Sequence, residues 1–202
     1  MKAPERRAQL LDAARHVFGL VGFHSASMEA VARRAEVSKP VLYDHFPSKR
    51  DLYVALIDED LEEVRVRVSE ALAAPTGNRE RVRASFQAYF DFVDRHAPGF
   101  RLLMREAVGA DRDVRRRVGR VRASILGEVA DLIVRESRGG LDRADAETVA
   151  LALVGMAETA AQREPGGPAE ARRKTVDTLV RFAWRGITGL TERDRPSSQV
   201  RH

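Results

Sequence analysis

The stretch SMEAVARRAEVSKPVLYDHFPSKRDL, residues 27–52, determines how the N-terminal end of this chain is expected to fold. It holds two short helical segments, and each follows a serine, Ser27 and Ser38. A serine before a helix accepts a hydrogen bond from one of the first backbone N–H groups, which have no partner inside the helix. Pro40 falls in the first turn of the second segment, where its missing N–H is harmless. Two short helices at this spacing predict a helix-turn-helix over residues 27–46.

Outside this stretch, apolar residues recur at intervals of three and four, which is the pattern of amphipathic helices. No segment has the alternation typical of a strand. The sequence therefore predicts an all-α fold of about nine helices, with an N-terminal three-helix domain and a C-terminal helical bundle. The expected helices are about 4–20 (ended by Gly22), 28–35, 39–46, 49–74, 79–96, a short one carrying Phe100 and Met104, 114–135, one from 142 or 145 to 164, and 169–188.

Charge is distributed unevenly along the 202 residues, whose net charge is +5. Residues 1–50 hold nine basic and five acidic groups, whereas residues 51–189 hold equal numbers of each. Such asymmetry indicates that the N-terminal end faces a polyanion, although chance could also produce it. Cysteine is absent, which excludes disulfides, thiolate zinc sites and a cysteine nucleophile. Without a long apolar run or a leader-like start, we expect a cytoplasmic protein with no membrane contact.

The second segment and its surroundings carry side chains suited to DNA. Its N-terminal residues would meet phosphates and base edges in the major groove. Small apolar groups there can touch a thymine methyl, and polar-tipped aromatics follow one turn later. A lysine at the start of the next helix can share a phosphate with that helix N-terminus. Taken singly, each has an ordinary explanation, since Tyr43 could simply pack against the core.

The N-terminal part of the sequence resembles a known family. LLDAARHVFGLVGF, residues 10–23, and VSKPVLYDHFPSKRDL, residues 37–52, are similar to the DNA-binding domain of TetR-type transcriptional regulators. The resemblance covers residues 6 to about 60. It implies phosphate contacts from Tyr43, His45 and Lys49 and base contacts from residues 39–41. The full set of implied DNA-contacting residues is Ser27, Ser38, Lys39, Pro40, Val41, Tyr43, His45 and Lys49.

Two residues depart from the family pattern. Glu36 stands in the turn where the family usually has glycine, so it either adopts an unusual backbone or points to solvent. Asp44 in the second helix of the motif would be repelled by phosphate, unless it accepts a hydrogen bond from a cytosine amino group. Both departures bear on which operator sequence is recognised.

The resemblance also implies a homodimer, a ligand cavity and binding to a palindromic operator. We expect a DNA-binding domain over residues 4–64, a ligand-binding and dimerisation domain over 65–190, and a flexible tail over 191–202. The hypothesis is a repressor that a small, mainly apolar ligand releases from its operator, with no cofactor and no metal. Residues that could line the cavity, although plain core packing would also explain them, are Phe86, Tyr89, Phe90, Phe100, Met104, Ile125, Met156 and Glu158.

The last two helices are the expected dimer interface, because aromatic residues lie off the apolar stripe of the ninth helix. The candidate interface residues are Val149, Leu153, Val176, Leu179, Val180, Ala183, Trp184 and Ile187. Glu158 lies in an otherwise apolar helix and needs a partner if it is buried. It could bind a cationic ligand or pair with an arginine across the dimer, and we favour the pair.

Three alternatives remain at this level. An enzyme is disfavoured because the sequence has no nucleophile–base pair, phosphate loop or metal-ligand spacing. A DNA-binding dimer without a small-molecule effector has the same sequence signals. An activator is equally compatible, because repression or activation depends on where the operator lies.

Overall fold

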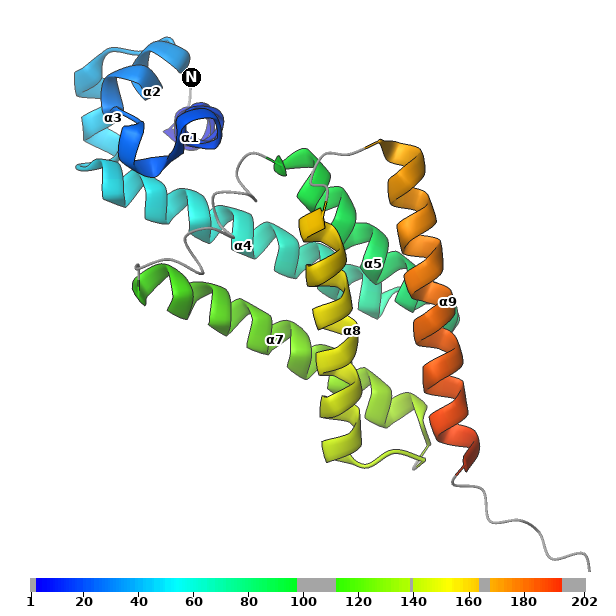
Figure 1. The fold of residues 1–202 in the computed structure, drawn as a ribbon. Helices are drawn as coiled ribbons and strands as arrows, with labels where there is room; N and C mark the ends of the chain where they lie inside the picture. The colour runs from blue at the N-terminus through cyan, green and yellow to red at the C-terminus, as the bar shows by residue number, and fades with distance from the viewer. Residues whose placement is uncertain (1–2, 98–111, 139, 164–167, 194–202) are drawn as a thin grey trace, which may run out of the picture. The chain divides into compact units, whose positions relative to one another are not determined.

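The computed structural model describes residues 3–97, 112–138, 140–163 and 168–193. Those residues form helices and turns without a strand, which confirms the expected all-α fold (Figure 1). None of the described helices is long and apolar enough to cross a membrane. The short helix expected around Phe100 and Met104 falls outside the described residues. The helices are α1 (Ala3–Ser25), α2 (Met28–Arg34), α3 (Lys39–His45), α4 (Lys49–Ala73), α5 (Asn78–Arg95), α7 (Arg112–Glu136), α8 (Arg143–Arg163) and α9 (Ala169–Arg193).

Helix α1 extends further than the sequence predicts. We expected it to stop at about Leu20, whereas it continues to Ser25 with one non-helical residue, Gly22, at φ 79° and ψ 164°. That backbone region is open essentially to glycine alone. Gly22 therefore kinks the helix, and about one more turn follows before the helix-turn-helix begins.

Side-chain caps are present at the starts of α2, α4 and α8. The Ser27 hydroxyl accepts from the Ala30 N–H at 3.1 Å. The Ser48 hydroxyl accepts from the Asp51 N–H at 3.1 Å and caps α4. Asp142 accepts from the backbone N–H three residues on at 2.8 Å and is the cap of α8. Ser38, by contrast, occupies the N-cap position of α3 without a side-chain cap hydrogen bond.

The chain forms two compact units. The first, called here the N-terminal unit, comprises residues up to 63 together with 93–121. Its core consists of apolar side chains from α1 to α4 and from α7, and each large one that is fully buried stabilises the unit by about 1.5–3 kcal/mol. The large side chains of this core include Leu10, Leu11, Phe18, Val31, Leu42, Leu52, Tyr53, Leu56, Ile57 and Val114.

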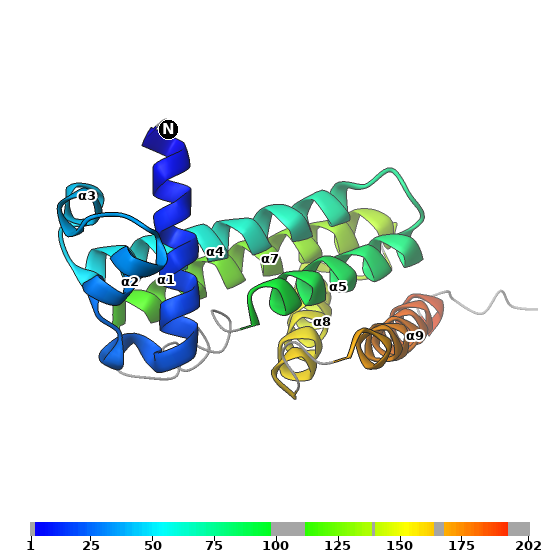
Figure 2. The same cartoon turned by 90° about the horizontal axis from the view of Figure 1, so that it is seen from above.

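The second unit, called here the C-terminal unit, comprises residues 64–92 and 122–202. Within it, Val129 and Ala130 of α7 form a buried cluster with Ala146 and Ala150 of α8. Alanine has a small side chain, so it lets two helices approach closely. Helices α8 and α9 lie side by side in both views of the ribbon (Figures 1 and 2). Helix α9 ends at Arg193, so the helix includes the first three residues of the expected tail.

Candidate DNA interface and ligand cavity

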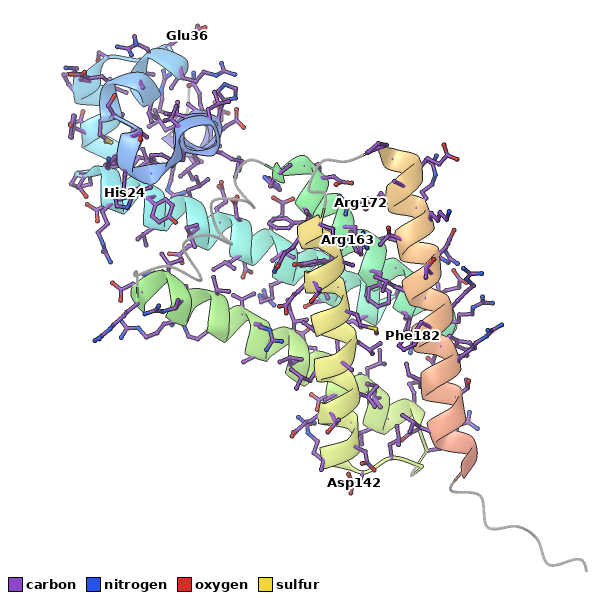
Figure 3. The ribbon with its side chains drawn as sticks, viewed as in Figure 1. His24, Glu36, Asp142, Arg163, Arg172 and Phe182 are labelled. Atoms are coloured by element: carbon purple, nitrogen blue, oxygen red, sulfur yellow. The ribbon has the colours of Figure 1, made fainter. Side chains whose placement is uncertain are left out.

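The turn between α2 and α3 is closed by backbone hydrogen bonds around Glu36. The Glu36 N–H donates to the Arg33 carbonyl at 3.2 Å, and the Val37 N–H donates to the Ala32 carbonyl at 3.0 Å. This pair of bonds is the Schellman ending of a helix, which requires a left-handed residue. Glu36, which is labelled in Figure 3, takes that role with φ 53°. The glutamate therefore keeps the glycine-type backbone.

Replacing Glu36 with glycine is expected to raise the free energy of unfolding by about 1 kcal/mol. A residue with a Cβ atom is strained by about 1–2 kcal/mol in the left-handed region, and glycine is not. Part of the gain is offset because glycine is more flexible in the unfolded chain. Urea unfolding followed by circular dichroism measures the difference.

Glu36→Gln is the matched control, because it removes the charge and keeps the Cβ atom. We expect its stability to remain close to that of the wild type. If Glu36→Gln is stabilised as much as Glu36→Gly, then charge repulsion explains the gain and the backbone explanation is wrong.

The side chains expected to contact DNA lie at the cap of α2, on α3 and at the start of α4. Ser27, Ser38, Lys39 and Pro40 are exposed, and Val41 and His45 are half-buried. Tyr43 is 46% exposed. The α3 surface thus presents a hydroxyl, an ammonium and a phenol to solvent, as a DNA-reading helix requires. Their contacts with DNA stay predictions.

Lys39 already has an acidic partner within the chain. Its ammonium forms an ion pair with Glu29 of α2, and both side chains are more than half exposed. The hydrogen bond from Lys39 lowers the pKa of the Glu29 carboxyl. Exposed ion pairs contribute little to stability. Lys39 can therefore leave Glu29 for a base or a phosphate at small cost.

Lys49 is held much more firmly. Its Nζ donates to the carbonyls of Phe23, His24 and Ala26 at 2.9, 3.1 and 2.9 Å. It also lies 4.8 Å from the centre of the Phe23 ring. These carbonyls belong to the end of α1 and the residues after it, where helical partners run out. Lys49 thus connects the start of α4 to the end of α1, and a phosphate contact from the same ammonium stays a prediction.

Sequence reasoning did not predict that Gln9 supports the helix-turn-helix. Gln9 of α1 donates through Nε2 to the carbonyl of Ala35 at 2.8 Å. Ala35 is the C-cap of α2, so this bond satisfies a carbonyl at the turn. The two residues are 26 positions apart, and no local pattern connects them.

The C-terminal unit contains a cavity of about 120 Å³ with an almost wholly apolar lining. Among the described residues, its polar lining is limited to Ser85, Tyr89, Arg122 and Glu158. A concave apolar site with few polar groups is typical of a small-molecule site. The apolar lining residues are Val68, Leu72, Val82, Phe86, Ile125, Val129, Leu132, Ile133, Leu153, Val154, Ala157 and Ile187.

Four of the eight residues expected in the cavity line it: Phe86, Tyr89, Ile125 and Glu158. Phe90 does not, because it is fully buried, and the guanidinium carbon of Arg172 lies 4.9 Å from its ring centre. Met156 is also outside the lining, and Phe100 and Met104 fall outside the described residues.

Glu158 has an arginine partner in its own chain, so it does not need the expected pairing across a dimer to neutralise its charge. Arg122 of α7 donates through Nε to both carboxylate oxygens of Glu158, at 2.9 and 3.1 Å. Tyr89 also lines the cavity, and burial, assisted by the charge of Glu158, raises the pKa of its phenol. Tyr89 therefore keeps its proton at neutral pH.

The residues expected at the dimer interface divide into different environments. Val176, Val180 and Ala183 are buried within one chain. Leu153 and Ile187 line the cavity, and the other three, Val149, Leu179 and Trp184, are half-buried. The large apolar side chains that α8 and α9 do expose are Leu151, Phe182 and Leu190, with Phe182 at 68% (Figure 3). The apolar stripe of α9 thus covers the core of its own chain, and a different side of the helix is exposed.

A helix-turn-helix in one unit and an apolar cavity in the other define a class of helical DNA-binding regulators. Two family models match the chain: "Bacterial regulatory proteins, tetR family" over residues 10–56 and "Tetracyclin repressor-like, C-terminal domain" over residues 78–186. The chain belongs to the TetR family of transcriptional regulators. Regulators of this family bind DNA operators and dimerise.

Relatives agree with this assignment. The chain is 37% identical over 185 residues to the HTH-type transcriptional activator FasR of Mycolicibacterium smegmatis, covering 91% of this chain and 84% of that protein. A TetR-like regulator from Rhodococcus sp. RHA1 has 33% identity and a TM-score of 0.74, over 94% of this chain and 99% of the other. The complex of AibR with isovaleryl coenzyme A and operator DNA has the same fold. Its TM-score is 0.68 at 20% identity, over 88% and 97% of the two chains.

Proposed function

We propose that this regulator binds a palindromic operator as a homodimer and that a mainly apolar small molecule in the cavity changes its affinity for DNA. The apolar cavity carries this proposal, because a regulator without an effector needs no such space. Its lining includes Val68 and Leu72 of α4. The complex of AibR supports an acyl-type effector, since AibR has the same fold and holds isovaleryl coenzyme A.

Helix α4 is the proposed path of coupling. One end of it carries Lys49 and Leu52 of the N-terminal unit, and the other end carries the two cavity residues. A dimer must present its two α3 helices to successive major grooves, about 34 Å apart. A ligand that shifts α4 would change this spacing. It can do so only if it binds one arrangement more tightly than the other.

For the dimer we propose an interface on α8 and α9 that includes the exposed side chains of Leu151 and Phe182. Exposed apolar side chains of this size mark association surfaces when they gather into a patch. The interface predicted from the sequence is revised accordingly, since Val176 and Val180 are already buried in the chain. A two-fold bundle of these helices would also supply the symmetry that a palindrome needs.

The regulator could either repress or activate transcription, and each possibility has a specific argument. The sequence hypothesis is repression, whereas the relative with 37% identity is named a transcriptional activator. The position of the operator separates the two. Selecting bound fragments from genomic DNA would locate it, and a site that overlaps the promoter supports repression. A site upstream of the promoter, with transcription increased by the protein, supports activation.

Replacing Tyr43 with alanine is expected to weaken binding to the selected operator and to unrelated duplexes alike. If the phenol donates to a phosphate, its loss should cost about tenfold in affinity, or ~1.4 kcal/mol. Lys39→Ala should instead change the preference between operator variants, because it removes a base contact. Fluorescence anisotropy at fixed salt measures both effects. Two wild-type chains should bind each palindrome.

Tyr43→Phe is the matched control for the hydroxyl, since it keeps the exposed ring. We expect it to lose most of the affinity that Tyr43→Ala loses. Wild-type affinity in both variants would refute the phosphate contact. One chain per palindrome would refute the dimer, and failure to select any DNA would refute operator binding.

A further inference from the structure

The polar end of the cavity is built from Tyr89, Arg122 and Glu158. One edge of the Arg122 guanidinium is paired and the other edge is open. Its Nε faces the two oxygens of Glu158. Among the described residues, neither Nη nitrogen of Arg122 donates a hydrogen bond to the protein. The side chain is 36% exposed and lines the cavity. Four N–H groups of a guanidinium therefore remain available beside an apolar wall.

A guanidinium in such a wall favours a particular ligand group. The Nη edge presents two parallel N–H bonds at the separation of the two oxygens of a carboxylate. Glu158 fixes the orientation of this edge and neutralises the arginine while the cavity is empty. Tyr89, with its proton retained, adds a hydroxyl on the same lining.

We infer that the cavity binds an amphipathic molecule whose apolar chain packs in the cavity and whose terminal carboxylate is held by the Nη edge of Arg122. This inference rests on the proposed function, in which an apolar ligand occupies the cavity, and adds the chemistry of its polar end. It also gives Glu158 a role as a positioning residue for Arg122.

A cationic ligand is the competing possibility, since Glu158 is the only acidic residue of the described lining. Such a ligand would have to displace Arg122 from Glu158. The displaced guanidinium would then lack its carboxylate partner beside the mostly apolar lining of the cavity. Leaving a charge unpaired in apolar surroundings is unfavourable. The arrangement of charges therefore favours a carboxylate over an ammonium.

The test compares three probes with the same eight-carbon chain: octanoate, octanol and octylammonium. Isothermal titration calorimetry with the full chain at pH 7.5 measures the affinity of each. We expect octanoate to bind at least tenfold more tightly than octanol and octylammonium to bind most weakly. In Arg122→Met, octanoate should lose its advantage over octanol. In Glu158→Gln, octanoate should bind several-fold more tightly, because a nearby negative charge is gone.

Arg143→Met is the matched control, because Arg143 also pairs with carboxylates in the C-terminal unit but lies outside the cavity lining. It should keep the wild-type preference. Equal binding of octanoate and octanol to the wild type, or tighter binding of octylammonium, would overturn the inference while leaving an apolar effector intact. If none of the three probes binds at millimolar concentration, both the inference and the apolar effector are refuted.

Discussion

Replacing Arg15 with methionine is expected to lower the free energy of unfolding by about 3–5 kcal/mol, because it leaves a buried carboxylate without its partner. Asp60 of α4 is 2% exposed. Arg15 of α1 donates to its Oδ1 from Nη2 at 2.7 Å and from Nε at 3.2 Å. Domains of this kind have only about 5–15 kcal/mol of stability in total. Urea unfolding at pH 7.5 should therefore show a large fall in the midpoint.

The loss should also depend on pH. Burial raises the pKa of Asp60 above its ordinary value of 3.8, although Arg15 opposes this shift. A carboxyl with a raised pKa in the folded state stabilises the fold when protonated, and this contribution is lost as the pH rises through that pKa. Removing Arg15 raises the folded-state pKa further. The difference between the wild type and Arg15→Met should therefore be larger at pH 7.5 than at pH 5.

The double variant Arg15→Met with Asp60→Asn is the control. A neutral amide needs no guanidinium, so it should recover part of the lost stability. If the double variant is no more stable than Arg15→Met, and the loss is the same at both pH values, then the buried charge does not explain the effect.

Replacing Lys49 with methionine should lower the free energy of unfolding by about 2–3 kcal/mol, the range of one or two hydrogen bonds to a charged group. Three carbonyls at the end of α1 and directly after it lose their donor. The bonds to Phe23 and Ala26 are partly buried and the bond to His24 is exposed, so water replaces some of the lost bonding. The connection between α1 and α4 should loosen, and affinity for the operator should fall with it. Urea unfolding and fluorescence anisotropy measure the two effects.

Lys39→Met is the matched control for stability, because it removes an ammonium of the same motif whose one ion pair among the described residues is exposed. It should change stability by less than ~0.5 kcal/mol. Lys49→Arg separates the two roles of Lys49, since it keeps the charge but replaces the compact ammonium with a planar fork. Wild-type stability in Lys49→Met would show that the three carbonyls do not need this donor.

Helices α1 to α4 of the N-terminal unit could mostly be predicted from the sequence, because the signals that begin and end them are local. The serine caps of α2 and α4 act within three residues, and Gly22 and Pro40 restrict the backbone where they stand. The left-handed turn at Glu36 was one of two possibilities that the sequence left open. The cavity was only partly predictable, because periodicity identifies apolar residues but not whether they face a space or a neighbour.

The sequence by itself determined the family, the all-helical fold and the position of the helix-turn-helix. Only the tertiary structure decided the partners of the charged residues. Asp60 pairs with Arg15, which is 45 positions away in the sequence, and Glu158 pairs with Arg122, which is 36 positions away. Lys49 donates to the Ala26 carbonyl, 23 positions away. The same packing turned Val176 and Val180 into the core of one chain. Caps and turns are set by bonds within a few residues, whereas these pairings exist only after whole helices have packed.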